Sequence, residues 1–134
     1  MELREDEIRL ETVDDEALRV FLKALEIAGG PRELVRKRHL TWVPSLLEAS
    51  YIVVLKERGR TEEEIAAWLG VTRQTVRLVA GADPDAVLKR LSKPTEGEEA
   101  RIHVAGGLAK LAWRALKRGE EVELLSALAR KEGT

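Results

Sequence analysis

Residues 61–81 read TEEEIAAWLGVTRQTVRLVAG and carry the start and stop signals of two short helices. Thr61 and Glu64 form a capping-box pattern, in which each side chain accepts a hydrogen bond from the other residue's backbone N–H. Gly70 stands where the first helix has to end, because glycine enters the left-handed conformation without a steric penalty. Thr72 can then cap a second helix. The stretch predicts two helices joined by a three-residue turn.

The apolar residues of this stretch fit two helices that cross steeply. Such a helix-turn-helix needs a small residue where the helix axes approach, a glycine at the turn and branched apolar residues between the helices. These places are filled by Ile65, Ala66, Leu69, Gly70, Val71, Val76 and Val79. Two consecutive helices of an ordinary bundle are the alternative interpretation. We favour a helix-turn-helix whose second helix spans about residues 72–81.

The second helix carries side chains suited to double-stranded DNA. The first turn of such a helix enters the major groove, and here it holds Thr72, Arg73, Gln74 and Thr75. Gln pairs bidentately with adenine and Arg with guanine, while Thr hydroxyls hold phosphate. Arg77 lies one turn further on and contacts a base or phosphate in this hypothesis, or only solvent in the alternative. The sequence predicts a DNA-binding surface formed by these five residues.

Basic residues on both sides of the motif are candidates for further phosphate contacts. The whole chain has a formal net charge of −1, but residues 31–60 hold seven bases and three acids. A local positive face is therefore expected on a nearly neutral protein. The flanking candidates are Arg58, Arg60, Lys89 and Arg90. The densest basic cluster, residues 36–38, is either a second backbone-contacting patch or the solvent face of a short helix.

The composition argues against an enzyme. The chain has 134 residues and no cysteine, which excludes disulfides, thiol catalysis and thiolate metal sites. His39 and His103 lack an acidic neighbour at ligand spacing, and Gly106-Gly107 is not part of a phosphate-binding loop. We expect no catalytic residue, no metal and no cofactor. With 35% charged residues and no Asn, the chain has the balance expected of a thermophile.

The first forty residues are expected to hold three elements. Residues 2–13 alternate apolar and charged residues, which suggests a short strand, and a frayed helix is nearly as well supported. Asp14 or Asp15 then caps a helix. Its expected inward stripe is Leu18, Phe21, Leu22 and Leu25. Residues 31–39 predict a short basic helix that starts at a proline.

The next expected element is the central helix of the core, residues 45–58. A buried strand over residues 51–55 is its alternative, against which the helical pattern on both sides argues. Another short helix follows the motif, and residues 1–91 form the first domain. The three tryptophans, Trp42, Trp68 and Trp113, are expected to be core anchors because each stands beside other apolar residues.

The end of the chain is expected to form a helical hairpin, residues 100–134, after a linker at residues 92–99. Its long helix, residues 98–118, carries two apolar stripes that a two-helix hairpin cannot bury alone. The hairpin therefore either packs back on the N-terminal helices or forms a dimer interface. We favour a homodimer, in which Ala105, Gly106 and Ala109 allow close backbone approach. The fold class is all-α, a multi-helix bundle with a helix-turn-helix.

No run approaches eighteen apolar residues and the N-terminus is charged throughout, so we expect a cytoplasmic protein without a membrane segment.

Residues 43–92 contain VPSLLEASYIVVLKERG, RTEEEIAAWLGVTRQT and VRLVAGADPDAVLKRL. This region resembles a small archaeal family described as probable regulatory domains found beside ATPases similar to the circadian-clock protein KaiC. The tail HVAGGLAKLAWRALKRGEEVELL is similar more loosely. The resemblance implies a regulatory or sensory role with an ATPase partner.

Two functions follow from these patterns. The first is a sequence-specific DNA-binding transcriptional regulator, acting as a homodimer that reads a pseudo-palindrome. The second is a protein-interaction or adaptor module of a signalling system, in which the same fold contacts a partner such as a KaiC-like ATPase. An acid-free second helix favours the first function, whereas the weak overall basicity favours the second.

Overall fold

The computed structural model describes residues 2–36, 42–90 and 97–123, and for residues 2–12, 34–36 and 90 it describes the backbone only. Within these ranges the chain is all-α, with seven helices and no strand. The helices are α1 (Glu2–Ile27), α2 (Pro31–Arg36), α3 (Val43–Glu57), α4 (Glu62–Leu69), α5 (Arg73–Ala80), α6 (Pro84–Arg90) and α7 (Glu98–Lys117). The expected fold class is confirmed. Among the described residues, none of the helices has the length and apolar composition of a membrane-spanning segment.

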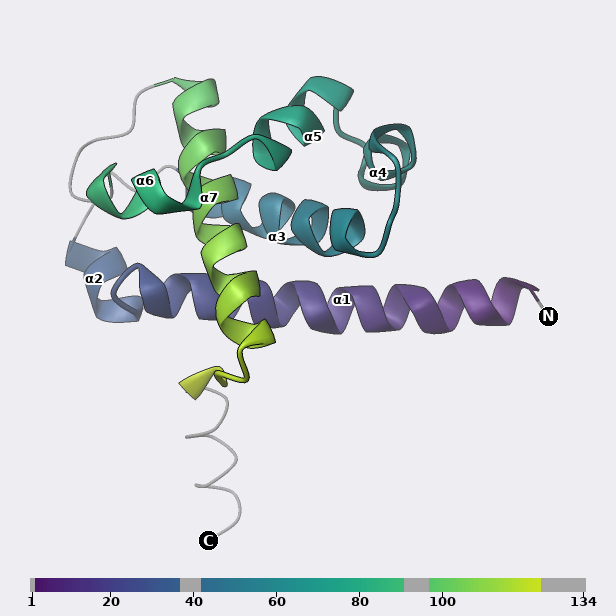
Figure 1. Ribbon diagram of the computed structural model, residues 1–134, viewed down its shortest axis with the longest axis horizontal. Coiled ribbons are helices and arrows are strands. Elements are labelled where there is room, and N and C mark those ends of the chain that lie inside the picture. The colour runs from purple at the N-terminus through teal and green to yellow at the C-terminus, as the bar shows by residue number, and fades with distance from the viewer. Residues whose placement is uncertain (1, 37–41, 91–96, 124–134) are drawn as a thin grey trace, which may run out of the picture.

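Helix α7 stands at the centre of the bundle and packs against α1, α3, α5 and α6. Figure 1 shows α7 crossing the long α1, while α4 and α5 lie on one side of α7 and α6 lies on the other. Helix α3 packs on both α1 and α7, so the three longest helices share one core. Fully buried side chains from these helices include Val20, Ala24, Leu46, Ile52, Val54, Ala105 and Leu108.

The expectation of a strand at residues 2–13 is wrong, because α1 is one continuous helix from Glu2. Asp14 and Asp15 therefore lie inside a helix and do not cap one. Asp14 instead accepts a hydrogen bond from the hydroxyl of Tyr51 on α3, at 2.7 Å. The buried residues from Val13 onward recur at helical spacing, in agreement with the observed helix. The weak alternation of apolar and charged residues before Val13 does not correspond to a strand.

The expected inward stripe of α1 is also wrong. Leu18 is 49% exposed, and Phe21, Leu22 and Leu25 are half-buried. The buried stripe consists of smaller residues, Val13, Ala17, Val20 and Ala24. Small side chains let one helix lie close to two neighbours at once, and α1 packs against both α3 and α7. The largest apolar side chains of α1 therefore do not mark its buried face.

Helix α3 is the apolar core helix that the sequence predicts, and the alternative of a strand at residues 51–55 is excluded. It starts at Val43, two residues earlier than expected, with Pro44 in its first turn, where a missing backbone N–H costs no hydrogen bond. Ser50 is fully buried, and its hydroxyl donates to the carbonyl oxygen of Leu46 at 2.8 Å. This polar group is therefore satisfied inside the core.

The C-terminal region follows the first of the two expected alternatives, because α7 packs back on the N-terminal helices. Ala105, Gly106 and Ala109 are buried within the chain, so the surface offered for a homodimer is already covered. Residues 98 and 99 of the expected linker form the first turn of α7, whereas residues 91–96 lie outside the described residues. Most of the predicted last helix also lies outside the described residues, which end at residue 123. Val122, which lies within them, is buried.

Candidate nucleic-acid interface

The helix-turn-helix begins with the capping box that its sequence predicts. The backbone N–H of Glu64 donates to the Thr61 hydroxyl at 3.2 Å, and the backbone N–H of Thr61 donates to the Glu64 carboxylate at 3.0 Å. Hydrogen bonding from Thr61, first of all from its backbone N–H, holds the pKa of the Glu64 carboxyl below its usual value. The same carboxylate lies 3.5 Å from Arg60. The start of α4 is thereby fixed by local contacts.

The turn between α4 and α5 takes the geometry that sets their crossing. Gly70 ends α4 with φ of 75°, a left-handed conformation that glycine adopts without strain. Thr72 then caps α5. Figure 1 shows α4 nearly end-on while α5 lies across the view, so the two helices cross steeply. The wedge between them and the core buries Ile65, Ala66, Val76 and Val79.

One face of α5 is left open to solvent. Arg73, Gln74 and Arg77 are exposed, whereas Val76 and Val79 on the opposite face are buried against α3, α4 and α7. The exposed side chains of Arg73 and Arg77 are 54% and 60% accessible. The structure thus brings the predicted base-contacting residues together on one acid-free helix face of α5.

The two threonines at the start of α5 serve its cap. The Thr72 hydroxyl accepts a hydrogen bond from the backbone N–H of Thr75 at 3.1 Å, and the two hydroxyl oxygens lie 2.9 Å apart. Thr75 is half-buried. Their first role is to fix where α5 begins, which places Arg73 and Gln74 on its outermost turn.

The variant Thr72→Ala is expected to lower the free energy of unfolding by about 1 kcal/mol, because it removes this cap. Urea denaturation followed by circular dichroism measures the change. Thr72→Ser keeps the accepting oxygen and is the control, with stability near that of the wild type. Equal stabilities of the alanine and serine variants would contradict the assignment.

Both arginines of the exposed face are paired with glutamates of α4. Arg77 Nε lies 2.7 Å from a carboxylate oxygen of Glu62, and Arg73 Nη1 lies 3.4 Å from one of Glu63. These two acids stand in the first turn of α4, where negative charge favours the start of a helix. The steep crossing brings the start of α4 beside the exposed face of α5, which no local sequence signal reveals. Residues Glu62 and Glu63 therefore belong to the candidate interface.

The flanking basic residues are not all brought to this surface. Arg58 ends α3 and donates from Nε to Glu16 of α1 at 3.1 Å, while Arg60 pairs with Glu64. Lys89 is exposed on α6, which lies on the far side of α7 from α4 (Figure 1). Arg90 is the last residue of α6, and its side chain lies outside the described part of the structure. Residues 37–41, which include His39 and two residues of the basic cluster, also lie outside it.

The expectation that every tryptophan anchors the core is wrong for Trp68. Trp42 is 1% exposed and Trp113 is half-buried, but Trp68 is 42% exposed. The Trp68 ring packs against Tyr51 with ring centroids 5.9 Å apart. Position 68 faces outward because α4 is short and buries Ile65 and Ala66 on its inner side.

Comparison of this chain with models of protein families, with curated proteins and with solved structures finds no match. Among the described residues no group of three or more His, Cys, Asp and Glu side chains is placed to hold a metal ion.

Proposed function

We propose that the protein is a sequence-specific DNA-binding regulator whose helix α5 enters the major groove. The observation that carries the proposal is the exposed first turn of α5, which presents Arg73 and Gln74 at the end of a steeply crossed helix pair. This is the part of a helix-turn-helix that contacts base edges. The buried valines of α5 fix the orientation of that turn relative to the core.

Each exposed residue has a definite chemical role in this proposal. Gln74 offers an amide donor and acceptor that match adenine N6 and N7. Arg73 offers a guanidinium fork that matches guanine O6 and N7. Arg77, one turn further along α5, reaches phosphate or a second base. Base contacts by the first two side chains supply sequence preference, and phosphate contacts supply the dependence on salt.

The ion pairs to α4 lower DNA affinity but do not prevent binding. Both arginine side chains are more than half exposed, and exposed ion pairs contribute about 0–1 kcal/mol. A phosphate or a guanine edge offers each guanidinium a partner of comparable or greater strength. The two glutamates would remain near the DNA backbone and repel it. The arrangement therefore predicts moderate affinity and a marked dependence on salt.

The variant Arg73→Ala/Arg77→Ala is expected to weaken binding to a preferred duplex by about 100-fold, because each lost contact is worth roughly a factor of ten. Fluorescence anisotropy of a labelled duplex, selected from random sequences, measures the dissociation constant. The control is Arg19→Ala/Arg101→Ala, which removes equal charge from α1 and α7. Equal effects of the two double variants would show that α5 is not the interface.

The glutamates provide a variant of the opposite sign. Glu62→Gln/Glu63→Gln keeps the side-chain shapes, releases both arginines and removes two negative charges, so it is expected to tighten DNA binding about threefold to tenfold.

Gln74→Ala is expected to leave affinity for mixed-sequence DNA nearly unchanged while reducing the preference for the selected site.

The second candidate function is a protein-interaction module for a partner such as a KaiC-like ATPase. The specific support is that α5 and α4 neutralise each other's charges, together with the exposed ring of Trp68. Interferometry with a purified KaiC-like ATPase tests it. A complex that survives Arg73→Ala/Arg77→Ala but is lost in Trp68→Ala, with no DNA binding by the wild type, would favour this function over the first.

The proposal concerns one DNA-binding unit. The α7 surface expected to form a homodimer is covered by α1, α3, α5 and α6 of the same chain. Reading a pseudo-palindrome would need a dimer through another face. Sedimentation equilibrium of the free protein and of its DNA complex determines how many chains bind one site.

A further inference from the structure

A pocket of about 280 Å³ lies behind α5, between that helix, α3 and α7. Its apolar part is lined by Ile52 and Val53 of α3 and by Val79 of α5. Trp113 of α7 adds an aromatic wall. The volume lies at the small end of ligand-binding pockets and suits a molecule of about ten heavy atoms.

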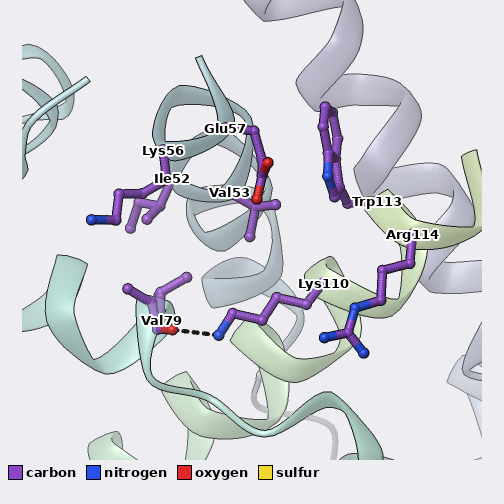
Figure 2. Close-up of a pocket in the computed structure, with 9 residues that line it drawn as sticks. Ile52, Val53, Lys56, Glu57, Val79, Lys110, Trp113 and Arg114 are labelled. Atoms are coloured by element: carbon purple, nitrogen blue, oxygen red, sulfur yellow. Dashed lines mark hydrogen bonds between the residues drawn. The ribbon is translucent and has the colours of Figure 1, made fainter. Parts of the chain in front are cut away.

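The α7 side of this pocket carries two cations one helical turn apart. Figure 2 shows Lys110 and Arg114 extending from α7, with Glu57 on α3 beside Trp113. The ammonium of Lys110 donates to the carbonyl oxygens of Ala80, at the end of α5, and of Ala82, at 2.8 Å from the latter. Burial, and next the charge of Arg114, lower the pKa of Lys110. Burial and the neighbouring positive charge therefore both disfavour the charged form of Lys110.

The nearby carboxylates offset this pair of cations only in part, because Asp83 and Glu57 raise the pKa of Lys110 less than burial and the charge of Arg114 lower it. The carboxylate of Asp85 is 4.0 Å from Arg114, at the limit of an ion pair, and both side chains are more than half exposed. Glu57 lines the pocket but forms no ion pair within 4.0 Å in the part of the chain that the structure describes. An anion between Lys110 and Arg114 would therefore remove a repulsion and gain charge-assisted hydrogen bonds.

We propose that this pocket binds a small carboxylate with an apolar body, its carboxylate on Lys110 and Arg114 and its body against Trp113 and Val79. The pocket lies on the other side of α5 from Arg73 and Gln74, so ligand binding there does not depend on whether the exposed face of α5 binds DNA. Because Lys110 also holds the carbonyl oxygens at the end of α5, such a ligand would contact the support of that helix directly.

Phenylacetate is the probe, since its ring and single carboxylate match the pocket in size and charge. Two-dimensional NMR of the full-length protein follows the indole N–H signal of Trp113, assigned with a Trp113→Phe variant. Saturable shifts with a Kd of about 1 mM or tighter are expected. Phenylacetamide, which has the same shape without the charge, is expected to bind at least about tenfold more weakly.

Two variants locate the site. Arg114→Gln is expected to weaken phenylacetate binding about tenfold, whereas Arg101→Gln, on the same helix outside the pocket, leaves it unchanged. Ala80→Leu fills the space without changing the charge and is expected to abolish the shifts, with its folded spectrum as the check on stability. The proposal is overturned by equal binding of acid and amide, by equal effects of the two arginine variants, or by no saturation at 10 mM, roughly ten times the expected Kd.

Discussion

Replacing both glycines in the middle of α7 with alanine, in Gly106→Ala/Gly107→Ala, is expected to lower the free energy of unfolding, by up to about 4 kcal/mol once the helix propensity of alanine is subtracted. A Cβ at position 106 would come within 2.9 Å of the Ala82 Cβ and 3.1 Å of the Val79 Cα. At position 107 it would meet the Val87 Cβ at 2.9 Å. Overpacking costs about 1–3 kcal/mol at each site.

The sign of this result separates packing from helix propensity. Alanine is favoured over glycine inside a helix by about 1 kcal/mol, so propensity alone predicts that the double variant is more stable than the wild type. Urea denaturation at 25 °C measures the difference. Adding Ala82→Gly to Gly106→Ala removes the nearest clashing Cβ and is expected to restore part of the loss. A stabilised double variant would contradict the close approach of α7 to α5 and α6.

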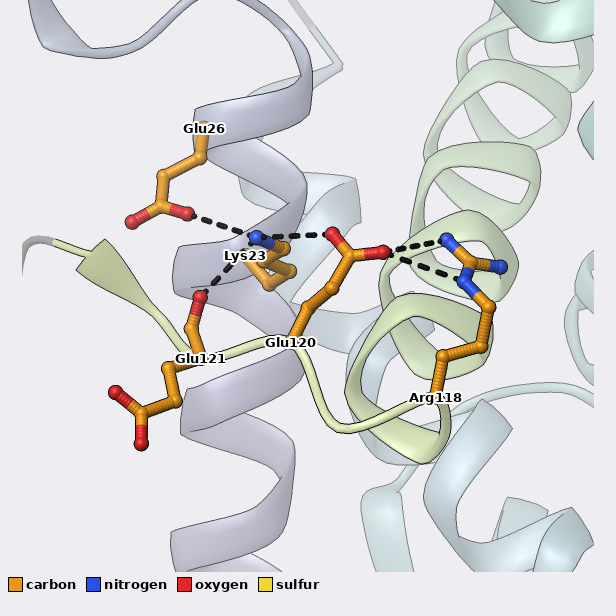
Figure 3. Close-up of polar contacts among 5 residues, drawn as sticks. All are labelled: Lys23, Glu26, Arg118, Glu120 and Glu121. Atoms are coloured by element: carbon orange, nitrogen blue, oxygen red, sulfur yellow. Dashed lines mark hydrogen bonds and ion pairs between the residues drawn. The ribbon is translucent and has the colours of Figure 1, made fainter.

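The second large effect is expected from Lys23→Met, which should cost about 2 kcal/mol of stability. Lys23 is only 8% exposed, and Figure 3 shows its ammonium joining α1 to the segment after α7. Nζ lies 3.3 Å from a Glu26 carboxylate oxygen and 3.5 Å from one of Glu120, and it donates to the Glu121 carbonyl oxygen at 3.1 Å. Methionine keeps the stem but leaves these oxygens without the cation.

An exposed ion pair on the same helix provides the matched control. Arg19 and Asp15 lie 3.6 Å apart with side chains 60% and 69% exposed, so Arg19→Met is expected to change stability by less than about 0.5 kcal/mol. Denaturation of both variants under the same conditions gives the comparison. A loss from Lys23→Met no larger than that from Arg19→Met would show that the buried cation does not fasten the end of α7 to α1.

Acid should weaken the same contact. Hydrogen bonds from Arg118, and then the contact with Lys23, hold the pKa of Glu120 below its ordinary value of 4.5. A carboxyl whose pKa is lowered in the folded state stabilises the protein above its ordinary pKa, and this contribution is lost as the pH falls through the folded pKa. The stability difference between the wild type and Lys23→Met should therefore narrow as the pH falls below 4.5.

Local backbone chemistry made the helix-turn-helix predictable from sequence. The caps at Thr61 and Thr72 and the left-handed Gly70 depend on residues within four positions of one another, and the structure has all three. The predicted start of α7 at Glu98 also agrees with the structure, although no side chain caps that helix. These features are set by individual backbone N–H and C=O groups, which the sequence displays directly.

Features that depend on how distant helices meet could not be predicted in the same way. The buried face of α1 follows Ala17 and Ala24 and leaves Leu18 exposed, because two neighbouring helices approach it closely. The outward position of Trp68 likewise follows from the packing of α4 as a whole. Hydrophobicity ranks such residues by transfer free energy, whereas their burial is decided by the space between helices.

Only part of the candidate interface could be predicted from the sequence, because the rest depends on how α4 and α5 meet. Residues of the first turn of α5 were identified because they follow a cap and a turn in sequence. The pairing of Arg77 with Glu62, fifteen positions earlier, needs the crossing of α4 and α5 and has no signature in the chain. The pocket cation Lys110 was missed because it acts through carbonyl oxygens of a segment about thirty residues away.

The most direct test of DNA reading by α5 is an anisotropy titration of wild-type protein with a selected duplex and a scrambled duplex at two salt concentrations. We expect tighter binding to the selected duplex, with affinity falling steeply between about 50 and 200 mM salt as phosphate contacts release counterions. No binding to either duplex at the lower salt concentration would contradict a DNA-binding role and leave the helix-turn-helix as a surface for a protein partner.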